Sequence, residues 1–197
     1  MKKFTHTKAP ANGKRPRVDS IKIKHIFDDS PHTDWLGTFT NQADPDDIKR
    51  HAVIPWKPGD SDTMDFFVPG NSLDSHKRSL AKMGYSKGEA DRLARSYVRQ
   101  DYERMKALDN EEFCMIGIQA EARVSYDEGQ GNRRLEWFTS SGLWGIESDS
   151  GPDYLADVER QELANLKGHL ERFNIDTSDF EAKAPQPDGD VDELEYH

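Results

Sequence analysis

The chain has 197 residues, a length typical of one domain, and a net charge of −10. Hydrophobic residues make up 34% and charged residues 32%, which indicates that part of the chain lies outside a folded core. Its single cysteine, Cys114, excludes an intramolecular disulfide and a cysteine-based zinc site, and it fits a reducing compartment. Because no run of about 18 apolar residues occurs, we predict no transmembrane helix and no membrane partner.

Charge is distributed unevenly along the chain. Residues 1–27 carry eight Lys or Arg against Asp19, a net charge of +7, whereas residues 176–197 carry −7. Segments with so much charge and so little apolar surface cannot bury enough area to order themselves. We therefore predict a basic disordered arm (1–18), a single α+β domain (19–175) and an acidic disordered tail (176–197).

The first predicted elements are strands. Isoleucines alternate with lysines over Ile21–Phe27, the period-two pattern of a strand with one buried face. Two short apolar pieces, Ala52–Trp56 and Phe66–Val68, are bounded by Pro or Gly and indicate short extended segments.

Three helices are predicted. A serine that suits an N-cap and a glycine that suits the C-terminal cap predict a helix over about residues 73–83. The capping box Ser86–Glu89 precedes apolar residues at helical spacing and predicts a helix over about 87–108. A proline suited to a first turn and a stripe of leucines predict the third helix over about 153–173.

Between the second and third helices the sequence predicts a long β-hairpin over about residues 113–139. Apolar residues alternate with polar ones from Cys114 to Tyr126, and the alternation resumes after a glycine-containing loop. One dry face and one wet face imply antiparallel pairing. The fold class is therefore α+β: a small antiparallel sheet with a long hairpin, packed by two to three helices.

The segment after the hairpin carries the candidate binding residues, which are Trp137, Trp144, Glu147 and Asp149. Two glycines flank Leu143 and Trp144, and the two acids lead into a helix N-terminus, so both tryptophans and Glu147 could line one pocket. The alternative is structural: the glycines allow a tight turn, the tryptophan fills the core and the acids favour the helix dipole. Catalytic residues are unknown on either interpretation.

An acidic loop offers a weak candidate metal site. Asp28, Asp29, His32 and Asp34 lie within seven residues, and three carboxylates with an imidazole could hold a divalent cation. A polar loop in which Asp and Ser cap their own backbone explains the same pattern. No phosphate-binding loop or other cofactor motif occurs, so we predict no metal and no cofactor.

Three stretches carry a resemblance: Gln100–Met105, Ile116–Ala122 and Ser141–Ser150 (SGLWGIESDS). Together they resemble a group of uncharacterised small proteins encoded by bacteriophages and other mobile elements, over about residues 97–172. The resemblance implies the cytoplasm of a bacterial host. It implies no activity, so no catalytic residue can be transferred.

Three functions remain open. The first is an acidic, non-catalytic phage or mobile-element protein that binds and inhibits a host defence or nucleic-acid-processing protein, with its negative field steering association. The second is a small hydrolase or nucleotide-modifying enzyme that uses the Trp144–Asp149 turn or the Asp28–Asp34 cluster. The third is an accessory binder of single-stranded nucleic acid that uses the basic arm, Lys2–Lys24, and exposed aromatics. The first is the interpretation we favour.

Overall fold

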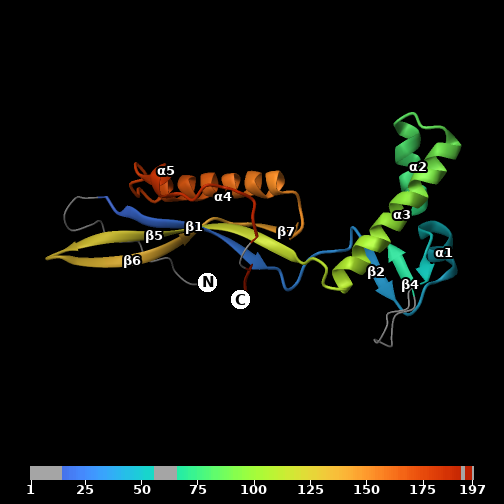
Figure 1. Ribbon diagram of the computed structural model, residues 1–197, viewed down its shortest axis with the longest axis horizontal. Helices are drawn as coiled ribbons and strands as arrows, with labels where there is room; N and C mark the ends of the chain where they lie inside the picture. Colours follow the sequence, from blue (N-terminus) through green and yellow to red (C-terminus); the bar gives the residue numbers. More distant parts are fainter. Residues whose placement is uncertain (1–14, 56–65, 192–193, 197) are drawn as a thin grey trace. The chain divides into compact units, whose positions relative to one another are not determined.

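The structure is a computed structural model that describes residues 15–55, 66–191 and 194–196. These residues form two compact units, each with its own core (Figure 1). Unit 1 comprises the described residues up to Asp29 and from Cys114 onward, and unit 2 runs from Ser30 to Phe113. The predicted α+β class is confirmed, whereas the structure has two units where we predicted a single domain. Alternation of apolar and polar residues identifies strands but does not reveal which strands pair. It therefore could not reveal that unit 2 is inserted in the sequence between the two parts of unit 1.

Unit 1 is built on one sheet. Strand β1 (Arg17–Phe27) pairs antiparallel with β5 (Met115–Gly129), which forms the predicted hairpin with β6 (Asn132–Thr139). Beyond β6, the same edge of β5 pairs with β7 (Leu143–Glu147). On the far edge of β1 lies β8 (Leu194–Glu195), which runs parallel to it. The sequence predicted neither β7 nor β8.

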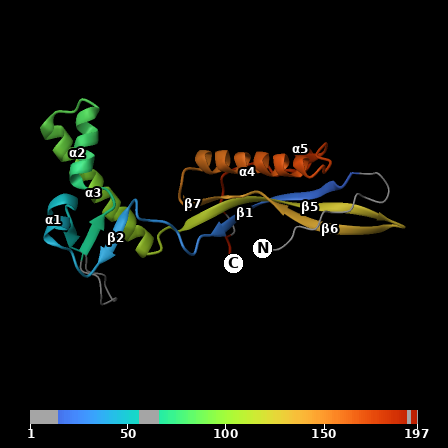
Figure 2. The same ribbon diagram turned by 180° about the vertical axis from the view of Figure 1, so that it is seen from behind.

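Helix α4 (Pro152–Arg172) covers one face of this sheet, as Figures 1 and 2 show from opposite sides. Its bounds agree with the predicted 153–173. The residues of β5 that face α4 are almost completely buried: Ile116, Ile118, Ala120, Ala122 and Val124. They pack with the apolar stripe of α4: Leu155, Val158, Leu163, Leu166 and Leu170.

The acidic C-terminal segment differs from the predicted disordered tail, because its described residues pack on unit 1. The short helix α5 (Phe180–Lys183) buries Phe180 in the core of the sheet and α4. Further on, the backbone N–H groups of Asp188 and Gly189 donate to Glu159 of α4 at 3.1 and 3.2 Å. The prediction of disorder used only the composition of this segment. Composition could not show that the buried carboxylate of Glu159 accepts backbone N–H groups from it.

The predicted basic arm lies mostly outside the described residues, since the description begins at residue 15. Arg17 and Val18, which we assigned to the arm, already belong to β1. Val18 is buried in the core, and the carbonyl of Pro16 accepts the backbone N–H of Asp176 at 2.7 Å. The ordered domain therefore begins before the predicted boundary.

Unit 2 contains a second sheet, in the order β2 (Gly37–Thr40), β4 (Phe66–Pro69) and β3 (Ile54–Pro55). Helix α1 (Pro45–His51) precedes β3, and the side chain of Asp44 caps it by accepting two backbone N–H groups. The sequence analysis predicted β3 and β4 approximately but not β2 or α1, whose stretch is rich in turn residues.

Helices α2 (Leu73–Lys82) and α3 (Lys87–Asp109) agree with their predicted ranges. The capping box of Ser86 and Glu89 is present in both directions. The helices pack through one apolar cluster: Leu73, Leu80, Ala90, Ala94 and Val98. None of the helices that the structure describes combines the length and apolar content that a membrane span requires.

One polar pair lies between α2 and α3. Nε2 of His76 is 3.9 Å from a carboxylate oxygen of Asp101, and both side chains are partly buried. Burial raises the pKa of Asp101 above its usual value, and the neighbouring His76 only partly opposes this shift. Ionised Asp101 therefore opposes folding of unit 2.

We expect Asp101→Asn to stabilise the protein at pH 7 but not at pH 3. The folded-state pKa of Asp101 lies above the unfolded one, so its contribution to stability is lost as pH rises through the folded pKa. Urea unfolding at both pH values measures the difference. Asp91→Asn on the same helix is the control with opposite sign, because Lys77 and Arg95 lower the pKa of Asp91. Equal responses of the two variants to pH would contradict this account.

Glu159 should be essential to unit 1. The residue is 1% exposed, and its carboxylate accepts two backbone N–H groups and lies 3.0 Å from Nε2 of His25. We expect Glu159→Ala to lower the free energy of unfolding by about 3 kcal/mol, because buried donors lose their acceptor. Urea unfolding checks this. Asp157→Ala, at an exposed position of α4, should change stability by less than about 0.5 kcal/mol.

Candidate functional site

The face of the unit 1 sheet opposite α4 is the candidate site. Side chains alternate along a strand, so the residues of β5 between those that face α4 point to this second face. Among the described residues of unit 1, no helix covers it (Figures 1 and 2). We call it the open face, and its members come from β1, β5, β6, β7 and β8: Lys22, Lys24, Gly117, Gln119, Glu121, Arg123, Leu135, Trp137, Trp144 and Glu195.

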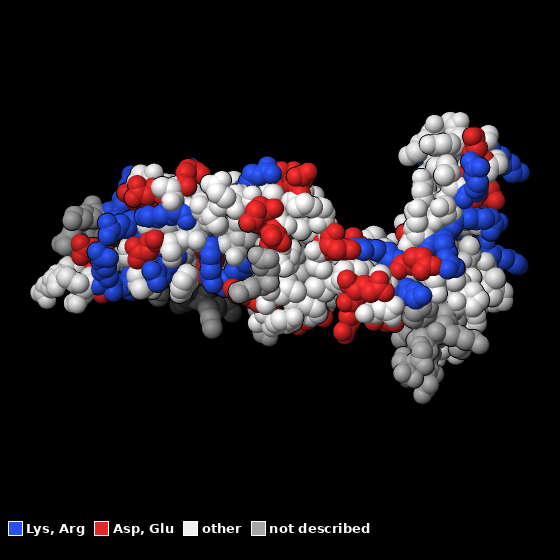
Figure 3. Space-filling model, in the orientation of Figure 1, with Lys and Arg blue, Asp and Glu red and all other residues white. Residues whose placement is uncertain are grey.

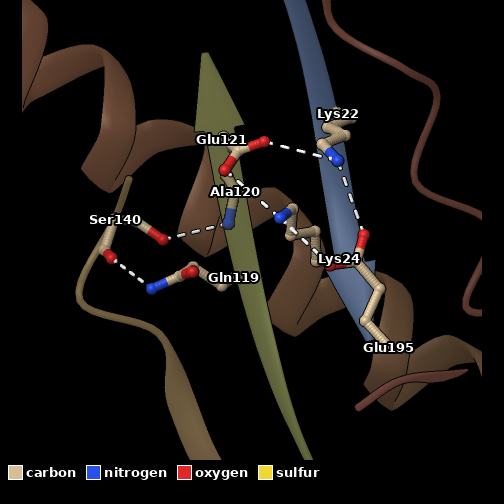
Figure 4. Close-up of polar contacts among 7 residues, drawn as sticks. All are labelled: Lys22, Lys24, Gln119, Ala120, Glu121, Ser140 and Glu195. Atoms are coloured by element: carbon tan, nitrogen blue, oxygen red, sulfur yellow. Dashed lines mark hydrogen bonds and ion pairs between the residues drawn. The ribbon is translucent and has the colours of Figure 1, made fainter. Parts of the chain in front are cut away.

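A ring of four ion pairs lies at the centre of the open face (Figure 4). Glu121 of β5 binds Lys22 at 3.3 Å and Lys24 at 3.2 Å. Glu195 binds the same two lysines, at 3.4 and 3.0 Å, from the opposite side of β1. The ring therefore connects β5, β1 and β8 and neutralises both lysines.

The ring shifts the titration of two of its members. Burial alone would lower the pKa of Lys24, but hydrogen bonds to Glu195 and Glu121 outweigh it and raise this pKa above its usual value. The hydrogen bond from Lys24 in turn lowers the pKa of Glu195. Both groups are thus held charged, which suits electrostatic binding rather than proton transfer.

On the side of β5 away from β1, Ser140 marks the point where the edge of β5 passes from β6 to β7. Its Oγ accepts the backbone N–H of Ala120 at 3.0 Å, and its carbonyl accepts Nε2 of Gln119 at 2.9 Å (Figure 4). The next turn places Gly142 at φ +76°, a left-handed conformation that favours glycine, and its N–H donates to buried Glu162 at 2.9 Å. These contacts fix where β7 begins.

Trp144 of β7 lies directly on Gly117 of β5. A Cβ placed on Gly117 would overlap the six-membered part of the Trp144 ring. Glycine therefore allows the indole to lie flat against the strand, while 42% of the tryptophan remains exposed. Gly117 comes from the stretch Ile116–Ala122 and Trp144 from Ser141–Ser150, so these two stretches meet at the open face.

Trp137 occupies another part of the open face, on β6 opposite Arg123. It is 56% exposed, and the cationic groups of Arg123 and Lys22 each lie 6.0 Å from its ring centroid, at the limit of a cation–π contact. Exposed tryptophan beside arginine is a composition enriched in protein interfaces.

The two predicted tryptophans lie on the open face, but the four candidate residues do not line one pocket. Trp144 sits at the level of Gly117 and Trp137 at the level of Arg123, six residues further along β5, a separation of about 20 Å. Glu147 pairs with Met115, further still from Trp137. Asp149 lies in the turn before α4 and is exposed.

The candidate metal residues are divided between the two units. Asp28 and Asp29 belong to unit 1, whereas His32 and Asp34 belong to unit 2. The latter two form a pair at 3.3 Å in which both side chains are 81% exposed. Within the described part of the chain, no group of three or more His, Cys, Asp or Glu is placed to hold a metal ion.

Sequence reasoning missed the ion-pair ring. The alternation of Lys22 and Lys24 with isoleucines put both lysines on one face, and Glu121 showed the same pattern on its own strand. Their meeting depends on the β1–β5 register, which pairs Lys22 with Glu121. No local signal identified Glu195, which falls in the segment predicted to be disordered.

Comparisons with known proteins give no match: no family model matches the chain, and neither a curated protein nor a solved structure does.

Acidic and basic side chains are interspersed on the face of unit 1 that Figure 3 shows. Among the described residues in that view, the acids do not form a continuous row. The negative charge of the chain is thus offset locally, as it is in the ion-pair ring.

Gly117→Ala should disturb the open face. We expect it to lower the free energy of unfolding by about 1–3 kcal/mol, because the added methyl group displaces Trp144. Urea unfolding measures the loss. In a Trp144→Ala background the same substitution should be much milder, since the overlap is gone, and an equal loss in both backgrounds would contradict the contact.

Proposed function

We propose that the chain is a non-catalytic binding protein of a bacteriophage or other mobile element, which binds and inhibits a protein of its bacterial host. The open face of unit 1 is the binding surface in this proposal. The observation that carries it is a pair of exposed tryptophans, Trp137 and Trp144, on either side of an ion-pair ring. They lie on a sheet face that no helix among the described residues of unit 1 covers.

The chemistry of this face suits a protein partner. Aromatic side chains and arginine are enriched at the centres of interfaces, where they carry most of the binding energy. The charges of the ring already satisfy one another, so a partner can cover them without leaving an unpaired buried charge. Extended backbone in a sheet also loses little entropy on binding, since it is ordered beforehand.

The competing functions have less support. An enzyme would need a pocket with an acid of raised pKa, and Asp101, the described carboxyl that burial shifts this way, lies in unit 2 among helices. A nucleic-acid binder would need cations available for phosphate. Lys22 and Lys24, two of the eight cations in residues 1–27, are instead bound to carboxylates.

Affinity capture from a nuclease-treated bacterial lysate tests the proposal when tryptophan variants are compared with a matched control. The tagged wild type and Tyr154→Ala, an exposed aromatic of α4, should retain one stoichiometric protein. Trp137→Ala and Trp144→Ala should each reduce its capture by about tenfold or more, as for interface hot spots. The partner is then purified, and its activity should fall when the wild-type protein is added.

Two results would contradict the proposal. One is a captured protein that both tryptophan variants retain as well as the Tyr154→Ala control does. The other is capture that nuclease treatment abolishes, which would instead favour the nucleic-acid function.

A further inference from the structure

The helical hairpin of unit 2 is positively charged in a chain that is acidic overall. Residues 72–99, which span α2, the turn and the first half of α3, carry seven Lys or Arg against three Asp or Glu, a net charge of +4. The whole chain carries −10. Because salt screens exposed charges beyond about 8 Å, the local charge of the hairpin decides which ligands it attracts at contact.

Most of this positive charge lies on one flank of the hairpin. Lys77 of α2 reaches across to Asp91 of α3 at 2.5 Å, and this ion pair marks the flank. On a helix, residues three or four positions apart are neighbours. Steps of that length along α3 from Asp91 reach four further cations. With Lys77 they form what we call the basic flank: Lys77, Lys87, Arg92, Arg95 and Arg99.

The opposite flank of the hairpin, as far as the structure describes it, carries no Lys or Arg. His76 of α2 and Tyr97 of α3 mark this flank, with ring centroids 5.5 Å apart. Their helical neighbours are uncharged or acidic: Ser72, Leu73, Ser79, Leu80, Leu93, Ala94, Gln100 and Asp101. Figure 3 shows Lys and Arg side chains along one side of the hairpin. Five of the seven cations thus share one flank.

Ion pairs within unit 2 do not neutralise the basic flank. Lys77 and Arg95 share the single carboxylate of Asp91, at 2.5 and 3.1 Å, so these three residues together keep a charge of +1. No carboxylate of the described residues pairs with Lys87 or Arg92, and both residues are exposed. Their positive charges are therefore available to an anionic ligand.

The sheet of unit 2 leaves the basic flank exposed. It packs on the second half of α3, where Tyr102 meets Phe67 with ring centroids 5.6 Å apart. Lys87 to Arg99 precede this contact and span about 18 Å of helix at about 1.5 Å per residue. Arg99, at the end of the row, pairs with Glu103 but keeps 61% of its side chain exposed. The row equals the axial length of about five base pairs at about 3.4 Å each.

Phosphate groups suit this row better than a protein partner does. Arginine binds two phosphate oxygens through parallel N–H groups, and three arginines stand in the row at helical spacing. Protein interfaces are usually anchored by buried aromatic or aliphatic side chains, and the members of the basic flank are all cations. Single strands bind through bases stacked on aromatic rings, whereas Tyr97 lies on the opposite flank.

We propose that the basic flank of unit 2 binds the phosphate backbone of double-stranded nucleic acid without reading its sequence. Lys87 and Arg92 contact phosphates near the tip of the hairpin, and the rest of the row follows the same side of the duplex. This site lies in a different unit from the open face and does not depend on the proposed function. Its cations also differ from Lys22 and Lys24, which are bound to carboxylates.

Fluorescence polarisation of a fluorescein-labelled DNA duplex of about 20 base pairs measures binding to the full chain. We expect saturable binding at about 0.05 M salt that weakens steeply as salt rises. The double variant Lys87→Gln, Arg92→Gln should bind at least about tenfold more weakly, and its log–log salt slope should be smaller by about 2. Arg160→Gln with Arg172→Gln, at exposed positions of α4, removes the same charge and should bind as the wild type does.

Three further probes define the ligand. Unlabelled polyglutamate at equal charge should displace little of the duplex, because it lacks the phosphate geometry that arginine matches. A single strand of the same sequence should bind at least about tenfold more weakly, since the flank offers no ring for its bases. An RNA duplex of the same sequence presents the same phosphate chemistry, and the duplex that binds more tightly identifies the natural source.

Lys2→Gln with Lys3→Gln removes the same charge from the N-terminal segment and should also bind as the wild type does. Each of four results would overturn the proposal: no binding of either duplex, unchanged affinity of the Lys87/Arg92 variant, an equal loss in either control variant, or equal binding of the single strand or polyglutamate. Trp137→Ala should bind the duplex normally, and the Lys87/Arg92 variant should retain the captured host protein. Either proposal can therefore fail without the other.

Discussion

The antiparallel pairing of β1 with β5 is the constraint on which the rest of unit 1 depends. It joins two segments that unit 2 separates in the sequence. The same register places Lys22 opposite Glu121 and puts the alternate isoleucines against α4. A shift by one residue would turn the lysines into the core, so the hydrophobic pattern and the ion-pair ring specify the same register.

Two buried carboxylates on α4 hold segments of unit 1 that have few apolar residues of their own. Glu159 holds the backbone at Asp188 and Gly189, and Glu162 holds the turn at Gly142. Acceptance of backbone N–H groups is the usual way in which a buried carboxylate is compensated. Some acidic residues of this chain therefore stabilise the fold. For this reason the net charge of −10 by itself says little about the chemistry of a binding partner.

The open face is the surface of unit 1 that the proposed function uses. The open face presents side chains, among them two tryptophans and a neutralised ring of charges. Helix α4 supports this face from behind, so binding there requires little rearrangement of the core.

The sequence by itself determined the elements that local physics decides. Helical periodicity with caps placed α2, α3 and α4 within about two residues, and alternation placed the β5–β6 hairpin. It also named Trp137 and Trp144 as binding candidates. Only the tertiary structure decided that two units exist, that Trp144 lies on Gly117 and that Glu195 completes the ring. Those outcomes depend on contacts between distant segments, which short-range periodicity and composition do not encode.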